Sequence, residues 1–140
     1  MSAHFLMMDV ILGQWNLQRS ENLPSFLKAL GVGVVLRNVA PKLNGSMLIE
    51  KLTETQFRIQ IANGFKSTDR VIEIGTDFEA DGANGSSMVG KWELESEKMV
   101  GRFKGENGDV LTIIREVVDG CLVQTMEIKG CTAKRIYHRT

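Results

Sequence analysis

The sequence has few cysteines and prolines, and neither sign of charge is in excess. Two cysteines among 140 residues are too few for a disulfide framework, which fits a reducing compartment such as the cytoplasm. Two prolines and 43% apolar residues argue against a disordered chain. Seventeen basic residues balance 17 acidic ones, so the strong positive charge of many nucleic-acid-binding proteins is lacking. We therefore expect one monomeric domain over residues 1–140 that binds no nucleic acid.

Long apolar runs and motifs for catalysis or metal binding are also lacking. No stretch approaches the roughly 18 apolar residues that a membrane-spanning helix needs. His4 and His138 lie far apart, without the spacing of metal ligands. No Ser-His-Asp pattern, glycine-rich phosphate loop or redox pair of cysteines stands out. These absences predict a protein that is not an enzyme and uses no metal or cofactor.

The first 12 residues are apolar but differ from a signal peptide. They lack a basic start, Asp9 interrupts the apolar run, and no clear cleavage site follows. We interpret residues 1–12 as a short structural lead-in to the domain.

The rest of the chain predicts one helical region followed by many short strands. Residues 22–40 carry apolar residues at helical spacing, and Gly31 and Gly33 divide them into two short helices. Elsewhere apolar and polar residues alternate, and turn sequences separate the alternating segments. The expected strands are Gly13–Ser20, Ser46–Leu52, Gln56–Asn63, Ser67–Ile74, Ser86–Glu95, Met99–Lys104, Asp109–Val117, Leu122–Ile128 and Cys131–Arg139. This pattern indicates a mainly β sandwich or barrel with antiparallel meander connections.

Two of the last strands place an arginine on an otherwise apolar face. Arg115 shares its face with Ile113, and Arg135 shares its face with Tyr137. A buried guanidinium needs an anion or many acceptors, and these faces carry no acidic residue. A bound carboxylate would meet that need, because arginine offers forked donors that match its two oxygens.

The strand between these two presents Gln124 and Met126 on one face. If the three strands are neighbours, this face lies between Arg115 and Arg135 and belongs to the same interior surface. Spacing alone also allows both arginines to face solvent, because a shift of one residue in register exchanges the two faces of a strand.

Several segments, in order over nearly the whole chain, form a specific combined pattern. They are Gly13–Leu17, Ser20–Gly33, Arg37–Ala40, Phe65–Thr68, Ile74–Glu79, Ile114–Val117 and Lys134–Tyr137. Their order and spacing resemble the intracellular lipid-binding protein family of the calycin superfamily. This family comprises the fatty-acid-binding proteins and their retinoid-binding relatives.

The resemblance implies a closed or nearly closed antiparallel barrel of about ten strands, with a helix-turn-helix lid over one end. It implies a carboxylate anchor deep in the interior, formed by Arg115, Arg135 and Tyr137. The expected ligand is a long-chain fatty acid or related lipid carboxylate. Retinoic acid fits the same anchor, whereas retinol is disfavoured because its binders tend to replace the arginines. The expected ligand-binding residues are Arg115, Arg135, Tyr137, Gln124, Met126 and Ile113.

The resemblance also places a portal at the lid, residues 22–40. The expected portal residues are Leu23, Phe26, Phe65 and Ala83. Just after Ala83, Asn84 and Ser86 replace an acidic and a basic residue of the family, so a polar contact to the ligand or to interior water is expected to be missing. Arg102 and Lys104 share a strand face that the resemblance places inside, and a solvated face is the open alternative.

Lys28 and Arg37 on the lid raise an alternative role. Family members that enter the nucleus present a basic cluster there, and Asn38 here occupies the third expected place. The chain would then be a lipid-signalling shuttle that contacts a membrane or a nuclear receptor, and it would be nuclear as well as cytoplasmic. Otherwise these cations are ordinary solvated surface charges.

Overall fold

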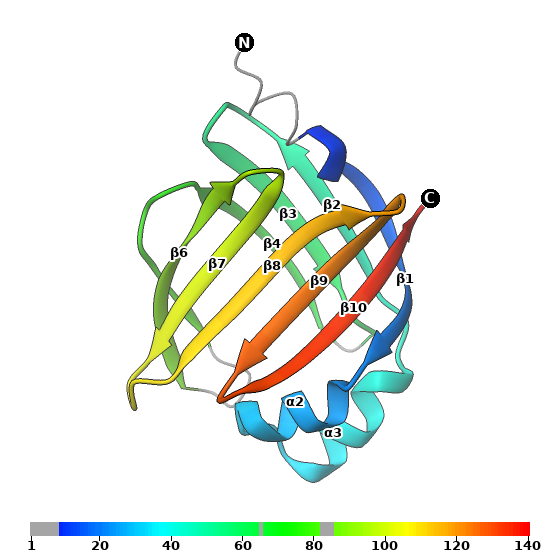
Figure 1. Ribbon diagram of the computed structural model, residues 1–140, viewed down its shortest axis with the longest axis vertical. Coiled ribbons are helices and arrows are strands. Elements are labelled where there is room, and N and C mark those ends of the chain that lie inside the picture. Colours follow the sequence, from blue (N-terminus) through cyan, green and yellow to red (C-terminus); the bar gives the residue numbers. More distant parts are fainter. Residues whose placement is uncertain (1–8, 65, 82–85) are drawn as a thin grey trace.

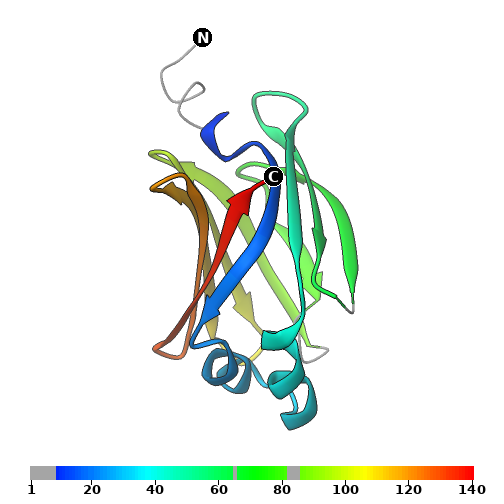
Figure 2. The ribbon, with the colours of Figure 1, turned by 90° about the vertical axis from the view of Figure 1, so that its right-hand side faces the viewer.

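The computed structural model describes residues 9–64, 66–81 and 86–140, which form ten antiparallel strands in one curled sheet (Figure 1). The strands are β1 (Gly13–Glu21), β2 (Ser46–Lys51), β3 (Gln56–Ala62), β4 (Ser67–Glu73), β5 (Phe78–Asp81), β6 (Ser87–Glu95), β7 (Lys98–Gly105), β8 (Val110–Val118), β9 (Cys121–Ile128) and β10 (Cys131–Arg139). Their order is β4-β3-β2-β1-β10-β9-β8-β7-β6-β5. Consecutive strands pair except β4 and β5, and β1 pairs with β10, as the turned view in Figure 2 shows. The predicted mainly β barrel is confirmed.

The sheet is not joined by backbone hydrogen bonds all the way round. β4 and β5 are the two ends of the strand order, and they do not pair within the described residues. A side-chain contact crosses the gap, where the guanidinium of Arg70 lies 5.4 Å from the centre of the Phe78 ring. The pattern of the sequence did not predict β5, which has only four residues. The barrel is therefore nearly closed, and two strand edges face each other.

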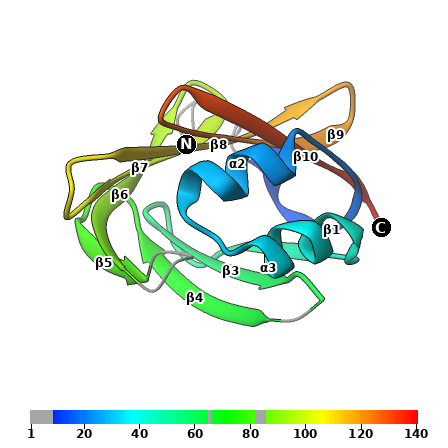
Figure 3. The same cartoon turned by 90° about the horizontal axis from the view of Figure 1, so that it is seen from below.

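Two helices, α2 (Leu23–Leu30) and α3 (Val34–Val39), cover one end of the barrel (Figure 3). A short 3-10 turn, η2 (Ala40–Lys42), leads from them into β2. α2 ends at Gly31, whose φ of 95° lies in the left-handed region that favours glycine. The start of α2 is tied to β10, because the side-chain amide of Asn22 donates to the carbonyl of Thr132 at 2.8 Å. The predicted lid over residues 22–40 is confirmed.

Part of the lead-in closes the opposite end of the barrel. The 3-10 turn η1 (Asp9–Ile11) lies across that end, in dark blue in Figure 1. Ile11 is fully buried, and its carbonyl accepts a hydrogen bond of 2.9 Å from the Trp15 indole. Arg139 donates to two further carbonyls of this segment, at 2.6 and 2.8 Å. The lead-in thus has a structural role that the sequence did not specify.

The alternation on β7 decides between the two interpretations of its cations. Phe103 is buried and faces the interior, so the flanking Arg102 and Lys104 face outward and are exposed. Arg102 forms a surface salt bridge with Glu95 at 2.6 Å. The solvated alternative is correct, and the interior position suggested by the resemblance is wrong for these two residues.

The two cysteines lie at opposite ends of the β9–β10 pair. Cys121 is the first residue of β9, whereas Cys131 is paired in register with Ile128, the last residue of β9. Both thiols are free. A bond between them within one molecule would require one of the two strands to be rebuilt.

Candidate functional site

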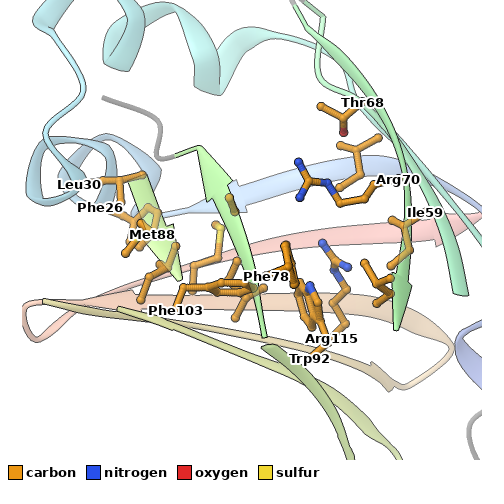
Figure 4. A pocket seen from close by; sticks show the side chains of 16 residues that line it. Phe26, Leu30, Ile59, Thr68, Arg70, Phe78, Met88, Trp92, Phe103 and Arg115 are labelled. Atoms are coloured by element: carbon orange, nitrogen blue, oxygen red, sulfur yellow. The ribbon is translucent and has the colours of Figure 1, made fainter. Parts of the chain in front are cut away.

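A cavity of about 330 Å³ lies inside the barrel beneath the lid (Figure 4). Its volume lies within the roughly 300–1,000 Å³ of typical small-molecule pockets. Within the described part of the chain, the wall is apolar except for Thr68, Arg70 and Arg115. The apolar lining consists of Phe26, Leu30, Ile59, Ile61, Ile72, Phe78, Ala80, Met88, Trp92, Phe103, Leu111, Ile113 and Met126. Such a wall suits an extended hydrocarbon chain, with polar recognition confined to a few points.

Arg115, on β8, is a buried cation held by neutral groups. It is 4% exposed, and its Nε donates to Oε1 of Gln124 at 2.9 Å. Its guanidinium lies 4.5 Å from the centre of the Trp92 ring. No salt bridge to it occurs among the described residues. Burial lowers the pKa of Arg115 to about 10, and the nearby Tyr137 opposes this shift.

The meander places the predicted anchor residues in one row across three strands. Arg115 on β8 pairs in register with Gln124 on β9, which in turn pairs with Arg135 on β10. The buried amide of Gln124 thus lies between the two arginines, and its nitrogen lies 3.4 Å from the sulfur of Met126. The structure brings together the residues that alternation had assigned to one face.

Arg135 and Tyr137 lie beside the cavity without bordering it. Tyr137 is buried, and this burial raises the pKa of its phenol, while Arg135 and Arg115 act in the opposite direction. Nε of Arg135 is buried without a hydrogen-bond partner, as is Oγ of Ser20, which is paired with it in register on β1. The predicted triad is therefore split, because Arg115 alone of the three borders the cavity.

The remaining predicted residues divide between the cavity wall and the lid. Ile113 and Met126 border the cavity, and Phe26 borders it from the lid. Leu23 is buried in the cluster that joins α2 to the barrel and does not border the cavity. The predicted positions Phe65, Ala83 and Asn84 lie outside the described residues.

Sequence reasoning missed Arg70 and Thr68, which reach the cavity from β4. The missed signal was alternation, since Thr68, Arg70 and Ile72 are spaced two apart and all line the cavity. β4 is polar on both faces except near its end, so its pattern did not indicate which face is inside.

Two classes of site find no support in the described part of the chain. No three side chains among His, Cys, Asp and Glu gather there in a way that could hold a metal ion. Within the same residues, every helix is too short or too polar to traverse a bilayer. The cavity is thus the candidate site that the geometry offers.

Comparison with known proteins assigns the fold to a family. No family model matches the chain. It is 36% identical over 132 residues to the intestinal fatty acid-binding protein of Rattus norvegicus, and 34% over 128 residues to that of Bos taurus. Both alignments cover 91% of this chain and 96% of the relative.

Solved structures show the same lidded barrel. The fluorescent protein UnaG superposes with a TM-score of 0.88 and 26% identity, covering 95% of this chain and 99% of that one. The REP1-NXSQ fatty acid transporter superposes with a TM-score of 0.82 and 29% identity, covering 93% and 96%. With the sequence identities found over nearly its full length, the chain belongs to the fatty-acid-binding protein family.

Proposed function

We propose that this protein carries a long-chain fatty acid, or a related lipid carboxylate, in its barrel, with the carboxylate bound at Arg115. One observation carries the proposal: the buried Arg115 guanidinium borders an apolar cavity and contacts only neutral groups among the described residues. A buried charge needs a counter-charge. A carboxylate supplies that charge, while its hydrocarbon chain covers the apolar wall. The relatives are named for fatty-acid binding and transport, which supports a carrier rather than an enzyme.

A rough energy balance agrees with tight but reversible binding. Burying about 15 methylenes contributes at most about 12 kcal/mol, at about 0.8 kcal/mol each. Association costs at least about 4 kcal/mol, which leaves roughly 8 kcal/mol, or about micromolar affinity. A charge-assisted anchor worth about 1.5–3 kcal/mol would bring the dissociation constant into the nanomolar range.

Identification of the bound lipid tests the proposal directly. Mass spectrometry of lipid extracted from gently purified protein is expected to find long-chain fatty acids. Retinoic acid, which fits the same anchor, is the second lipid carboxylate to seek. An extract that holds only neutral lipids would contradict a carboxylate anchor.

Replacing Arg135 with alanine is expected to weaken fatty-acid binding about 10-fold, and methyl-ester binding less than about 2-fold. Arg135 lies one strand from Gln124 and near Tyr137, so its charge favours a carboxylate in the cavity without direct contact. Titration calorimetry with both ligands measures the two losses. Arg102→Ala, on the outer face of β7, is the control and should change neither. Equal losses for acid and ester would show that Arg135 does not sense the carboxylate.

A second role, transient contact with a membrane surface, is favoured by the exposed face of α3. This helix buries none of its residues, and Val34, Val35 and Val39 are 56%, 74% and 45% exposed. Lys28 and Arg37 add positive charge to the same lid. Exposed valines beside cations suit the interface of an anionic bilayer. We infer that the lid touches membranes when the ligand is transferred.

Replacing Val35 with serine is expected to slow ligand transfer to anionic vesicles about 5- to 10-fold, because a valine that enters the bilayer interface contributes about 1–1.5 kcal/mol. Transfer of a fluorescent fatty acid to vesicles, followed in time, measures the rate. Val71→Ser, an exposed position on the outer face of β4, should have no effect. If the transfer rate is the same for the wild type and Val35→Ser, and does not depend on vesicle charge, membrane contact is refuted. Delivery to a protein partner would then be favoured instead.

A further inference from the structure

A second guanidinium borders the cavity, on a different wall from Arg115. Arg70 lies on β4, where it alternates with Thr68 and Ile72, and all three line the cavity. Its register partner on β3 is Ile59, another lining residue. Figure 4 shows the side chains of Arg70 and Arg115 reaching into the same interior space from different strands.

Arg70 has no acidic partner in the part of the chain that the structure describes. No salt bridge to it is formed there, and its guanidinium lies over the ring of Phe78 at 5.4 Å. The adjacent carboxylate, Asp69, points to the outer face of β4. There it accepts hydrogen bonds of 2.9 and 2.6 Å from Arg58. Arg70 is an exposed side chain, so its guanidinium keeps access to the space that it borders.

Two cations in one cavity impose a condition on the ligand. Among the described residues, the lining contains no carboxylate, and Thr68 is its only uncharged polar residue. A fatty acid with a single carboxylate at Arg115 brings bare hydrocarbon past Arg70. That contact removes water from a guanidinium without offering an acceptor, which is unfavourable. A second carboxylate on the same ligand would remove this penalty and add charge-assisted hydrogen bonds.

We propose that Arg70 determines ligand specificity by binding a second anionic group. The preferred ligand is then a lipid with two carboxylates joined by a hydrocarbon chain. This inference rests on the proposed function, since it places the first carboxylate at Arg115. The hydrocarbon between the two carboxylates lies along the apolar wall, and its length must match the separation of the two guanidiniums. Preference among ligands therefore follows chain length as well as charge.

The test compares α,ω-dicarboxylic acids of graded length with monocarboxylic acids of the same lengths. Titration calorimetry gives both dissociation constants for the wild type, for Arg70→Met and for Arg70→Gln. The quantity of interest is the ratio of the two affinities, because the ratio cancels effects of the variant on general lipid binding. At the preferred length, each variant is expected to lower the preference for the dicarboxylate about 10- to 100-fold.

Monocarboxylate binding by the same variants is the reference for the ratio, and measurable binding also shows that they are folded. Arg19→Met removes one exposed charge from the outside of β1 and is expected to leave the ratio unchanged. If the ratio of dicarboxylate to monocarboxylate affinity is unchanged in both Arg70 variants and fatty-acid binding is intact, the role proposed for Arg70 is overturned. The proposed function is then unaffected. A wild-type protein that binds neither acid would overturn this inference and the proposed function together.

Discussion

Replacing Arg115 with methionine is expected to weaken fatty-acid binding at least about 100-fold and to stabilise the unliganded protein by about 1–2 kcal/mol. The two effects have one cause. Without a ligand, the Arg115 guanidinium is a buried charge whose contacts are neutral among the described residues. With a ligand, the same charge meets its counter-charge. Under the proposed function, the unliganded protein would therefore be less stable because of its carboxylate site.

The sign of the stability effect follows from the pKa. Burial lowers the pKa of Arg115 in the folded state from its ordinary value to about 10, so folding disfavours its charged form. The penalty, about 3 kcal/mol, is fully present below pH 10 and disappears only as the pH rises toward the ordinary pKa of an arginine side chain. Loss of the contacts to Gln124 and Trp92 offsets part of the gain in the variant, because each is worth about 1 kcal/mol.

Two measurements separate these effects. Titration calorimetry with a fatty acid and its methyl ester gives the loss of affinity, which should be much smaller for the ester. Urea unfolding of lipid-free protein at neutral pH gives the change in stability. Arg102→Met, on the outer face of β7, should alter neither quantity. If Arg115→Met binds fatty acid as tightly as the wild type, the carboxylate anchor is Arg135 or Arg70 instead. If the lipid-free variant is less stable than the lipid-free wild type, the Arg115 guanidinium stabilises the fold.

The row of candidate anchor residues was predictable because its strands have one clearly apolar face. On β8 and β9 the alternation runs through many apolar residues, so the register fixes which side Arg115 and Gln124 occupy. β4 has polar residues on both faces, so its pattern does not show which face lies inside the barrel. Arg70 therefore could not be placed from the sequence, although its spacing from Ile72 was visible.

Other features depend on contacts between distant residues. β5 has four residues and exists through its pairing with β6, where Glu79 lies opposite Val89. The pairing of β1 with β10 shifts between Leu17 and Arg19, next to Tyr137. Alternation predicts the face of a residue in this region. It does not predict whether the side chain reaches the cavity, so the position of Arg135 beside the cavity was not foreseen.

Amide hydrogens of α3 are expected to exchange at least about 1,000-fold faster than those of β8 in the lipid-free protein. α3 has six residues and buries none of them, and helices this short are marginal without packing. α2 is held more firmly, because Leu23 and Phe26 are buried against β9 and β10. Hydrogen exchange followed by mass spectrometry should therefore show α3 opening first, α2 next and β8 last.

Bound fatty acid should slow exchange in α2 more than in α3, because Phe26 and Leu30 of α2 border the cavity. This difference would identify the lid as the moving part through which the ligand enters. The unpaired edges of β4 and β5, bridged by the contact of Arg70 with Phe78, are the competing route. If α3 proves as protected as β8 without lipid, and the slowing on binding is confined to β4 and β5, the ligand enters between these two strands.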